Sequence, residues 1–145
     1  MTTYLLDANV LIALIDRGHV HAARVRAWMA DVASFALCPV VQGALVRYLV
    51  RNGESRQAIT SALKVIAQRA GYEFWPDDID YTNLDLTGVQ GHRQVTDAYL
   101  VALADARPDA CLATLDKGLV AAHPTATEVP EPSDDEQAPA PADGA

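Results

Sequence analysis

The sequence predicts a three-layer α/β/α sandwich with a four- or five-stranded parallel sheet. Short apolar stretches of strand length alternate along the chain with longer amphipathic stretches, and no segment repeats at a fixed period. Such alternation is typical of parallel sheets that carry helices on both faces. The length of 145 residues fits one domain that buries a sizeable core of its own.

The expected strands are short and mostly apolar. The first, TYLL, stops at Asp7, and a later one, ACLAT, stops shortly before Asp116. Strands that are buried on both faces form apolar runs and not an alternation of apolar and polar residues. The predicted strands are residues 3–6, 34–38, 72–75 and 110–114, with 126–129 as a fifth.

The helices are predicted from the spacing of apolar residues and from helix-start signals. Asn9, Ser55 and Thr96 are side chains of the kind that cap a helix N-terminus, and each precedes or opens a helical pattern. Pro39 suits the first turn of a helix that runs to about Arg51. The predicted helices are residues 9–16, 19–32, 39–51, 55–70 and 97–106, with shorter helical turns within 84–95 and 115–122.

The last part of the chain differs from the rest in composition. From Pro130 onward it consists mainly of proline, alanine and acidic residues. A segment with so few large apolar side chains cannot offset the entropy lost on ordering, so we expect it to be disordered. The sequence therefore predicts a domain at 1–129 and a tail at 130–145.

The charges are unevenly distributed along the chain. Five acids in residues 131–145 account for much of the net charge of −8 and leave −3 for the domain. Residues 17–69 hold eight basic and two acidic side chains, whereas residues 70–130 hold three basic and ten acidic ones. A basic region beside an acidic cleft suits a polyanion on one side and a bound cation on the other. Arginines on amphipathic helices also have a simpler interpretation as solvated surface.

Several classes of protein are excluded by simple patterns. The opening residues lack the basic leader of a signal peptide and the apolar runs are too short for a membrane span, so we expect a cytoplasmic protein. Cys38 and Cys111 stand far apart in apolar surroundings and predict reduced thiols. His19 and His21 lack the spacing of a zinc site, and no nucleotide-binding glycine loop or serine-hydrolase motif occurs.

Three aspartates are predicted to meet at one edge of the sheet. Asp7 follows the first strand, Asp116 follows the fourth, and Asp97 opens the helix that precedes the fourth. Ligands of open parallel sheets bind at the carboxyl ends of the strands. Clustered carboxylates repel one another unless a divalent cation lies between them, and oxygen ligands are those that Mg²⁺ prefers. Such a cation activates water and neutralises charge on a phosphate, which points to metal-dependent hydrolysis of phosphodiesters.

Each aspartate also has a purely structural interpretation. Asp7 suits a turn that caps a helix, and Asp116 suits an ordinary turn. Asp97 lies in a first helical turn, where an acid is favourable in any protein. The joint placement of the three at one predicted edge is what favours a metal site.

Four segments resemble the PIN-domain family, and specifically the VapC-type toxins of bacterial toxin–antitoxin pairs. They occur in the family's order over residues 1 to about 129: LLDANVLIAL, CPVVQGALVRYL, GHRQVTDAYLVALA and CLATLDKGL. The resemblance implies an endoribonuclease that depends on Mg²⁺ or Mn²⁺ and cuts structured or loop RNA such as tRNA, rRNA or mRNA. It also implies a homodimer and inhibition by a cognate VapB-like antitoxin.

The resemblance assigns roles to individual residues. Asp7, Asp97 and Asp116 match family acids that ligate the metal, Thr114 matches a hydroxyl that lines the site, and Asn9 matches the polar residue after the first aspartate. One position departs from the family pattern, because Gln42 stands where many members have glutamate. Glutamine keeps an acceptor oxygen but loses the charge, so a second metal ion would bind less well and this residue cannot act as a base.

Arg47 and Arg51 lie one turn apart on the same predicted helix. They are candidates for binding substrate phosphates or are ordinary surface arginines.

The departure at Gln42 leaves an alternative to the nuclease open. The chain could be a PIN-fold module, catalytically weakened by Gln42, that binds RNA or protein without cutting. A phosphatase with an aspartate nucleophile is a remote third, because Asn9 stands where that chemistry needs a second acid.

Overall fold

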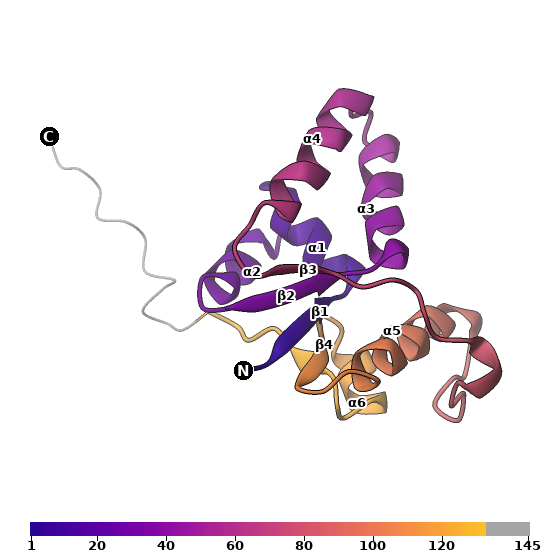
Figure 1. The fold of residues 1–145 in the computed structure, drawn as a ribbon. Helices are drawn as coiled ribbons and strands as arrows, with labels where there is room; N and C mark the ends of the chain where they lie inside the picture. Colours follow the sequence, from indigo (N-terminus) through magenta and orange to yellow (C-terminus); the bar gives the residue numbers. More distant parts are fainter. Residues whose placement is uncertain (133–145) are drawn as a thin grey trace, which may run out of the picture.

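A five-stranded parallel sheet forms the middle layer of the molecule (Figure 1). The computed structural model describes residues 1–132, and its strand order is β3-β2-β1-β4-β5 with every neighbouring pair parallel. This confirms the predicted fold class and the fifth strand. The strands are β1 (Thr3–Leu6), β2 (Ser34–Leu37), β3 (Tyr72–Phe74), β4 (Ala110–Thr114) and β5 (Thr127–Glu128).

The helices cover both faces of this sheet. Helices α1 to α4 lie on one side, and α5 and α6 lie on the other (Figure 1). Right-handed crossovers account for this division, because the chain adds β2 and β3 in one direction and β4 and β5 in the other. The helices are α1 (Ala8–Ile15), α2 (Ala22–Met29), α3 (Pro39–Arg51), α4 (Arg56–Ala67), α5 (Val95–Asp105) and α6 (Lys117–Ala122), with 3-10 turns η1 (Tyr81–Asn83) and η2 (His92–Gln94) before α5.

The direction of strand addition reverses between β1 and β4. The chain leaves β1 toward β2 and β3, and later returns to place β4 on the other side of β1. The carboxyl ends of two strands at such a reversal diverge into helices on opposite faces and leave a crevice between them. Asp7 comes directly after β1, and Asp116 comes two residues after β4.

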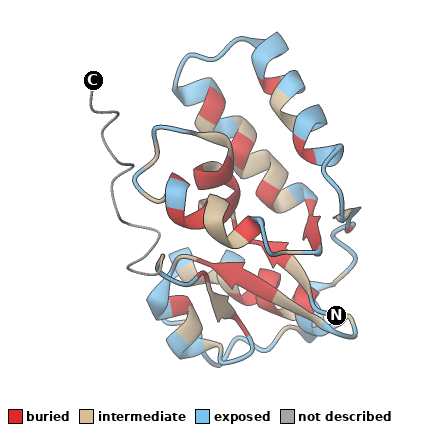
Figure 2. Cartoon of the chain, turned by 90° about the vertical axis from the view of Figure 1, so that its left-hand side faces the viewer, coloured by how far each residue is buried: buried red, intermediate tan, exposed pale blue. Residues whose placement is uncertain are grey.

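The core lies on both faces of the sheet and is mostly aliphatic. Leu5, Phe35 and Leu112 are fully or nearly fully buried, as is Cys38 just after β2. Buried residues gather on the strands and on the helices that pack against them (Figure 2). Both cysteines are free thiols, as predicted, and burial raises the pKa of Cys38 to about 11. No helix within residues 1–132 is long and apolar enough to cross a membrane.

The helix starts differ from the prediction in two places. Asp7, not Asn9, is the N-cap of α1, and its carboxylate accepts a hydrogen bond from the Ala8 N–H at 2.7 Å. Thr96 lies inside α5 and does not cap it, because η2 runs directly into that helix. Ser55 caps α4 as predicted and accepts from the Ala58 N–H at 3.1 Å.

Helix α2 is shorter than the predicted 19–32 because a turn occupies its expected first residues. The Asp16 carboxylate accepts from the Gly18 N–H at 3.0 Å, and the Asp16 carbonyl accepts from the His19 N–H at 3.0 Å. These bonds hold the chain in a turn, so regular helix begins only at Ala22.

A buried arginine on α2 holds the end of the described chain. Arg24 is 6% exposed, and its guanidinium forms ion pairs of 3.1 Å with both Glu128 and Glu131. The same group donates to the Val129 carbonyl at 3.0 Å and to the Pro130 carbonyl at 3.2 Å. The first residues of the predicted tail therefore contact the domain, and its residues 133–145 lie outside the described part of the chain.

Candidate active site

Asp7 is held at the end of β1 by bonds from two sides. Its N–H donates to the Ala113 carbonyl of β4 at 2.9 Å, and its carboxylate accepts from the Ala8 N–H and, at 2.8 Å, from the Thr114 hydroxyl. The residue is only 7% exposed. Burial raises the pKa of Asp7 more than these hydrogen bonds lower it, and the negative charge of Asp116 raises it further.

The Thr114 hydroxyl connects the two strand ends. Besides donating to Asp7, it accepts from the Asp116 N–H at 3.0 Å and from the Asn9 amide at 3.3 Å. The Asn9 carbonyl oxygen in turn accepts from the Leu115 N–H at 3.2 Å. Asn9 and Thr114, both predicted to line the site, thus hold Asp7 and the Asp116 backbone in one network across the β1–β4 junction.

Asp116 is the N-cap of the short helix α6. Its Oδ1 accepts a hydrogen bond from the Leu119 N–H at 3.1 Å. A side chain at Gly118 would bring a Cβ to 3.2 Å from that oxygen, so the position favours the smallest residue. Asp116 therefore has a structural role, as its simpler interpretation predicted, but it caps a helix and does not only form a turn. It also lies at the predicted edge of the sheet.

Asp97, in the first turn of α5, lies close enough to the other two carboxylates to feel their charge. Its pKa rises to about 6, first because the carboxylate is partly buried and then because Asp7 and Asp116 repel its negative form. A nearby His123 lowers the pKa by a smaller amount. The three aspartates are thus electrostatic neighbours, as their places in the sequence predicted, and none forms an ion pair within residues 1–132.

A hollow of about 210 Å³ opens beside Asp97 and Asp116. Arg93 and His123 also line it, and sequence reasoning missed both of them as site residues. Arg93 stands one helical turn before Asp97, a spacing that places two side chains on one face and was a usable signal. His123 stands at the end of α6, and nothing in its local sequence marked it.

The chemistry of the three carboxylates fits a divalent cation. All are oxygen donors, they repel one another, and no basic side chain within residues 1–132 pairs with them. No three acidic, histidine or cysteine side chains of the described residues stand close enough together to form a ready ligand cluster. The carboxylates of Asp7 and Asp116 are instead engaged with Thr114 and with helix N–H groups.

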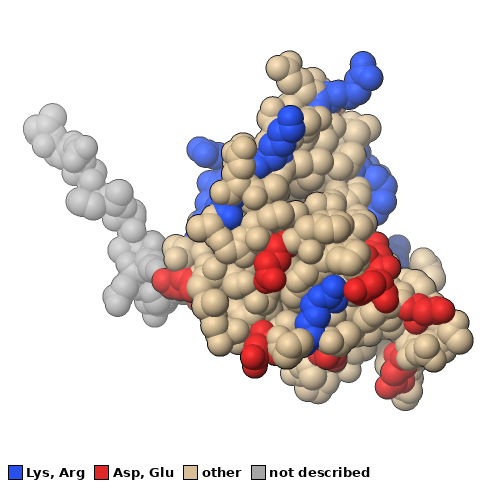
Figure 3. All heavy atoms as spheres, viewed as in Figure 1, with Lys and Arg blue, Asp and Glu red and all other residues tan. Residues whose placement is uncertain are grey.

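The remaining predicted site residues do not join this cluster. Gln42 lies near the start of α3, where its side chain lowers the pKa of Tyr72 at the start of β3 against the larger rise caused by burial. Arg47 and Arg51 line a separate open hollow along α3 and not the one beside Asp97. Their charges contribute to a basic region over α3 and α4, while most acids visible in the same view lie over the lower half of the molecule (Figure 3).

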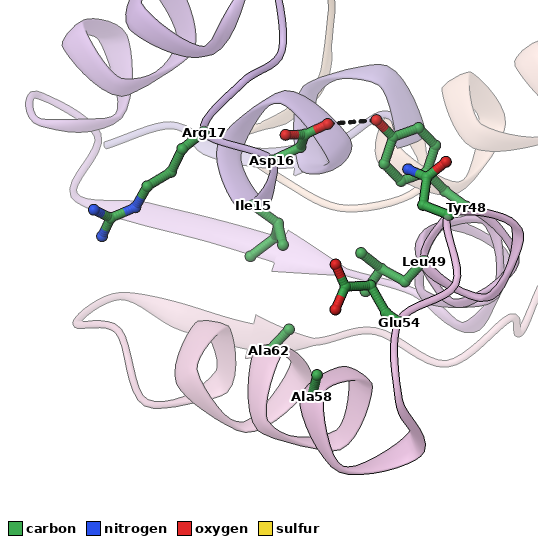
Figure 4. Close-up of a pocket in the computed structure, with 9 residues that line it drawn as sticks. Ile15, Asp16, Arg17, Tyr48, Leu49, Glu54, Ala58 and Ala62 are labelled. Carbon is green, nitrogen blue, oxygen red and sulfur yellow. Dashed lines mark hydrogen bonds between the residues drawn. The ribbon is translucent and has the colours of Figure 1, made fainter.

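Another hollow, of about 270 Å³, lies between the end of α1, α3 and the start of α4 (Figure 4). Its acids are Asp16 and Glu54, and Figure 4 shows the Glu54 carboxylate pointing into the hollow. Asp16 accepts a hydrogen bond from the Tyr48 hydroxyl at 2.5 Å, which lowers its pKa. This hollow offers two acids, one fewer than the aspartate edge, and is therefore the weaker candidate for a metal site.

Comparison with known families assigns this fold to a family. A family model described as the PIN domain matches residues 4–123. The chain belongs to the PIN-domain family. Within that family it is of the VapC type, because it is 49% identical over 122 residues to Ribonuclease VapC29 of Mycobacterium tuberculosis, covering 83% of this chain and 91% of that protein. Ribonuclease VapC39 of the same organism is 39% identical over 128 residues, covering 81% and 91% respectively.

A solved structure has the same fold as this PIN domain. The crystal structure of PAE2754 from Pyrobaculum aerophilum superimposes with a TM-score of 0.59 over 88% of this chain and 84% of the other. Its sequence identity of 20% supports the fold alone.

Proposed function

We propose that this PIN domain is a metal-dependent endoribonuclease and acts as the toxin of a toxin–antitoxin pair. The observation that carries the proposal is the approach of Asp7, Asp97 and Asp116 at the β1–β4 edge, where burial of Asp97, together with the negative charges of Asp7 and Asp116, raises its pKa to about 6. The names of the two mycobacterial ribonucleases support RNA as the substrate class. Single-stranded loops are its most accessible targets, because their backbone and bases are not packed in a duplex.

Asp7, Asp97 and Asp116 are the residues that would hold Mg²⁺ or Mn²⁺. When bound there, the ion would lower the pKa of a water molecule and neutralise charge on the phosphate. Thr114 and Asn9 fix the position of Asp7 through their hydrogen bonds and so set where a ligand oxygen stands. The burial of Asp7 keeps bulk water from one side of the edge.

Gln42, Arg47 and Arg51 have supporting roles in this proposal. The two arginines would bind phosphates of the RNA strand where it passes over α3. Gln42 carries no charge, so its proposed role is limited to orienting water or substrate near the aspartates. This favours a single metal ion over two.

The test is RNA cleavage by the purified chain freed of any antitoxin. Total cellular RNA is incubated with Mg²⁺, with Mn²⁺ or with EDTA, beside the Asp7→Asn variant. Asparagine keeps an oxygen to cap α1 but loses the negative charge, so we expect a folded protein that cuts roughly a hundredfold more slowly or worse. Asp31→Asn, an exposed change remote from the aspartates in the sequence, is the matched control and keeps full activity.

A second function is favoured by Gln42. If the folded chain cuts no RNA with either metal, the domain is a binding module, and the Gln42→Glu variant then tests whether the missing acid is the reason. A VapB-like antitoxin and a homodimer are proposed partners in either case, on the strength of the VapC relatives. Co-purification with the neighbouring gene product and light scattering test them.

A further inference from the structure

Two side chains that are able to bind anions line the hollow beside Asp97 and Asp116. Arg93 comes from η2, just before α5, and His123 follows the last turn of α6. They therefore belong to two different walls of the hollow. A hollow shared by metal-binding acids and by groups of this kind has the charge pattern that a bound phosphodiester needs.

The charge of Arg93 is not used within the described protein. Arg93 is exposed and forms no ion pair within residues 1–132, although Asp97 stands one helical turn further on. Arg107 shows the contrast, because it pairs with Asp78 at 3.4 Å and lies over the Trp75 ring at 4.3 Å. In a region where residues 70–130 hold ten acids, an unpaired arginine at the hollow is available for a ligand.

The size of the hollow restricts what it binds. Its volume of about 210 Å³ is below the roughly 300–1,000 Å³ of pockets that enclose drug-sized ligands. It is large enough for a phosphate group and part of a sugar. Gly88 contributes to this space, because a Cβ there would lie 3.7 Å from the His123 ring.

We propose that Arg93 and His123 bind the RNA phosphate that neighbours the cleaved one along the strand. This hollow would then be a phosphate subsite of the active site. The inference rests on the proposed function, since it assigns the neighbouring aspartates to the metal and the cleaved phosphate. Arg93 supplies charge and several N–H donors, and His123 supplies one ring N–H donor or two. Neither side chain contacts the reacting atoms, so both determine substrate affinity and position.

The test separates RNA binding from RNA cleavage. Binding of bulk transfer RNA to the Asp7→Asn protein is measured by filter binding with Mg²⁺ at several salt concentrations. Adding Arg93→Ala is expected to weaken binding roughly tenfold and to lower the slope of log affinity against log salt by about one. His123→Ala is expected to weaken it by roughly fivefold, and Arg93→Lys to restore part of the affinity.

Arg56→Ala controls for the loss of a positive charge as such, because Arg56 is exposed on α4 and lines none of the hollows described above. In the active chain, Arg93→Ala is expected to raise KM more than it lowers kcat. If Arg93→Ala weakens binding no more than Arg56→Ala does, the phosphate subsite is wrong while the nuclease stands. If the unmodified chain cuts no RNA, the proposed function fails and takes this inference with it.

Discussion

Asp97 differs from the other two carboxylates of the site because no group within residues 1–132 donates a hydrogen bond to it. Asp7 accepts from Thr114 and Ala8, and Asp116 accepts from Leu119. Asp97 therefore meets burial and two negative neighbours with only the smaller effect of His123 against them, which is why its pKa rises from 3.8 to about 6. A proton on Asp97 relieves the repulsion, and so does a bound cation.

This predicts that protons compete with the metal near pH 6. Because the folded pKa of Asp97 is above its unfolded value, its protonation stabilises the metal-free fold, and this contribution is lost as pH rises through about 6. We expect the rise in melting temperature on adding Mg²⁺ to be large at about pH 7.5 and small at about pH 5. Thermal unfolding with Mg²⁺ and with EDTA measures it, and a metal effect equal at both pH values would contradict the assignment.

Replacing Asp97 by asparagine is expected to separate stability from metal binding. Asp97→Asn removes the charge that Asp7 and Asp116 repel, so the metal-free protein at neutral pH becomes more stable. The same variant loses most of the stabilisation by Mg²⁺ because a ligand is gone. Urea unfolding in EDTA and in Mg²⁺ checks both effects, with Asp31→Asn as the control that leaves each unchanged. A less stable metal-free variant would show that Asp97 is not repelled.

Thr114 is the second residue on which the geometry of the site depends, through its buried hydroxyl. Thr114→Val removes the donor to Asp7 and the acceptor of the Asp116 N–H, and we expect a loss of about 1–3 kcal/mol in the free energy of unfolding. Thr114→Ser keeps the hydroxyl and is expected to lose about 1 kcal/mol for the missing methyl group. Urea titration distinguishes the two, and equal losses would mean that packing and not hydrogen bonding matters at this position.

At the scale of helices and strands, the sheet could be predicted because buried parallel strands are apolar runs with turns at both ends. The start of α1 had two candidate caps in the sequence, Asp7 and Asn9, and the start of α2 could not be predicted, because it depends on whether the Asp16 side chain turns toward the backbone ahead of it. In each case an aspartate side chain accepts a hydrogen bond from an N–H group that has no partner within a regular helix. Propensity alone does not decide which of two nearby polar residues does so.

The same limit applies to the site. The proximity of Asp7, Asp97 and Asp116 follows from their places at the ends of parallel strands and at the start of a helix. The sequence pattern predicts those places. The proximity of Gln42 to Tyr72 does not follow in this way, because the two residues are thirty positions apart in the sequence and meet only in the folded chain. His123 reaches the hollow only through the length of α6, which ends at Ala122.

The contact between α2 and the end of the described chain predicts a localised stability effect. Arg24→Ala removes the interactions of a buried guanidinium with four partner residues and leaves Glu128 unpaired, so we expect a loss of about 2–3 kcal/mol. Glu131→Gln is expected to cost under about 1 kcal/mol, because Glu131 is 66% exposed. Urea midpoints measure both changes. Equal effects would mean that the buried bonds to the chain end contribute nothing.

Across the whole molecule, the open face of α3 is the candidate for self-association. Val50 is 60% exposed there, beside Arg47 and Arg51 along the helix. The proposed function assigns Arg47 and Arg51 of this helix to RNA, so a homodimer on this face is the competing assignment. If the homodimer uses it, Val50→Asp places a charge in an apolar contact and yields a monomer without destabilising the core. Light scattering measures the mass, with Val20→Asp, 85% exposed before α2, as the control that stays dimeric. A Val50→Asp dimer would place the interface elsewhere.

Two of the three aspartates have a structural role besides the proposed catalytic one. Finding them in a related sequence is therefore weak evidence that the relative is a nuclease. Asp7 caps α1 and Asp116 caps α6, so a descendant that had lost all cleavage would still be selected to keep an acid or amide at both positions. Asp97 caps nothing, and without a metal its charge destabilises the fold. Among related sequences, replacement of the aspartate at position 97 is therefore the earlier sign that a domain has lost catalysis. Positions 7 and 116 would still carry an acid or an amide in such a domain.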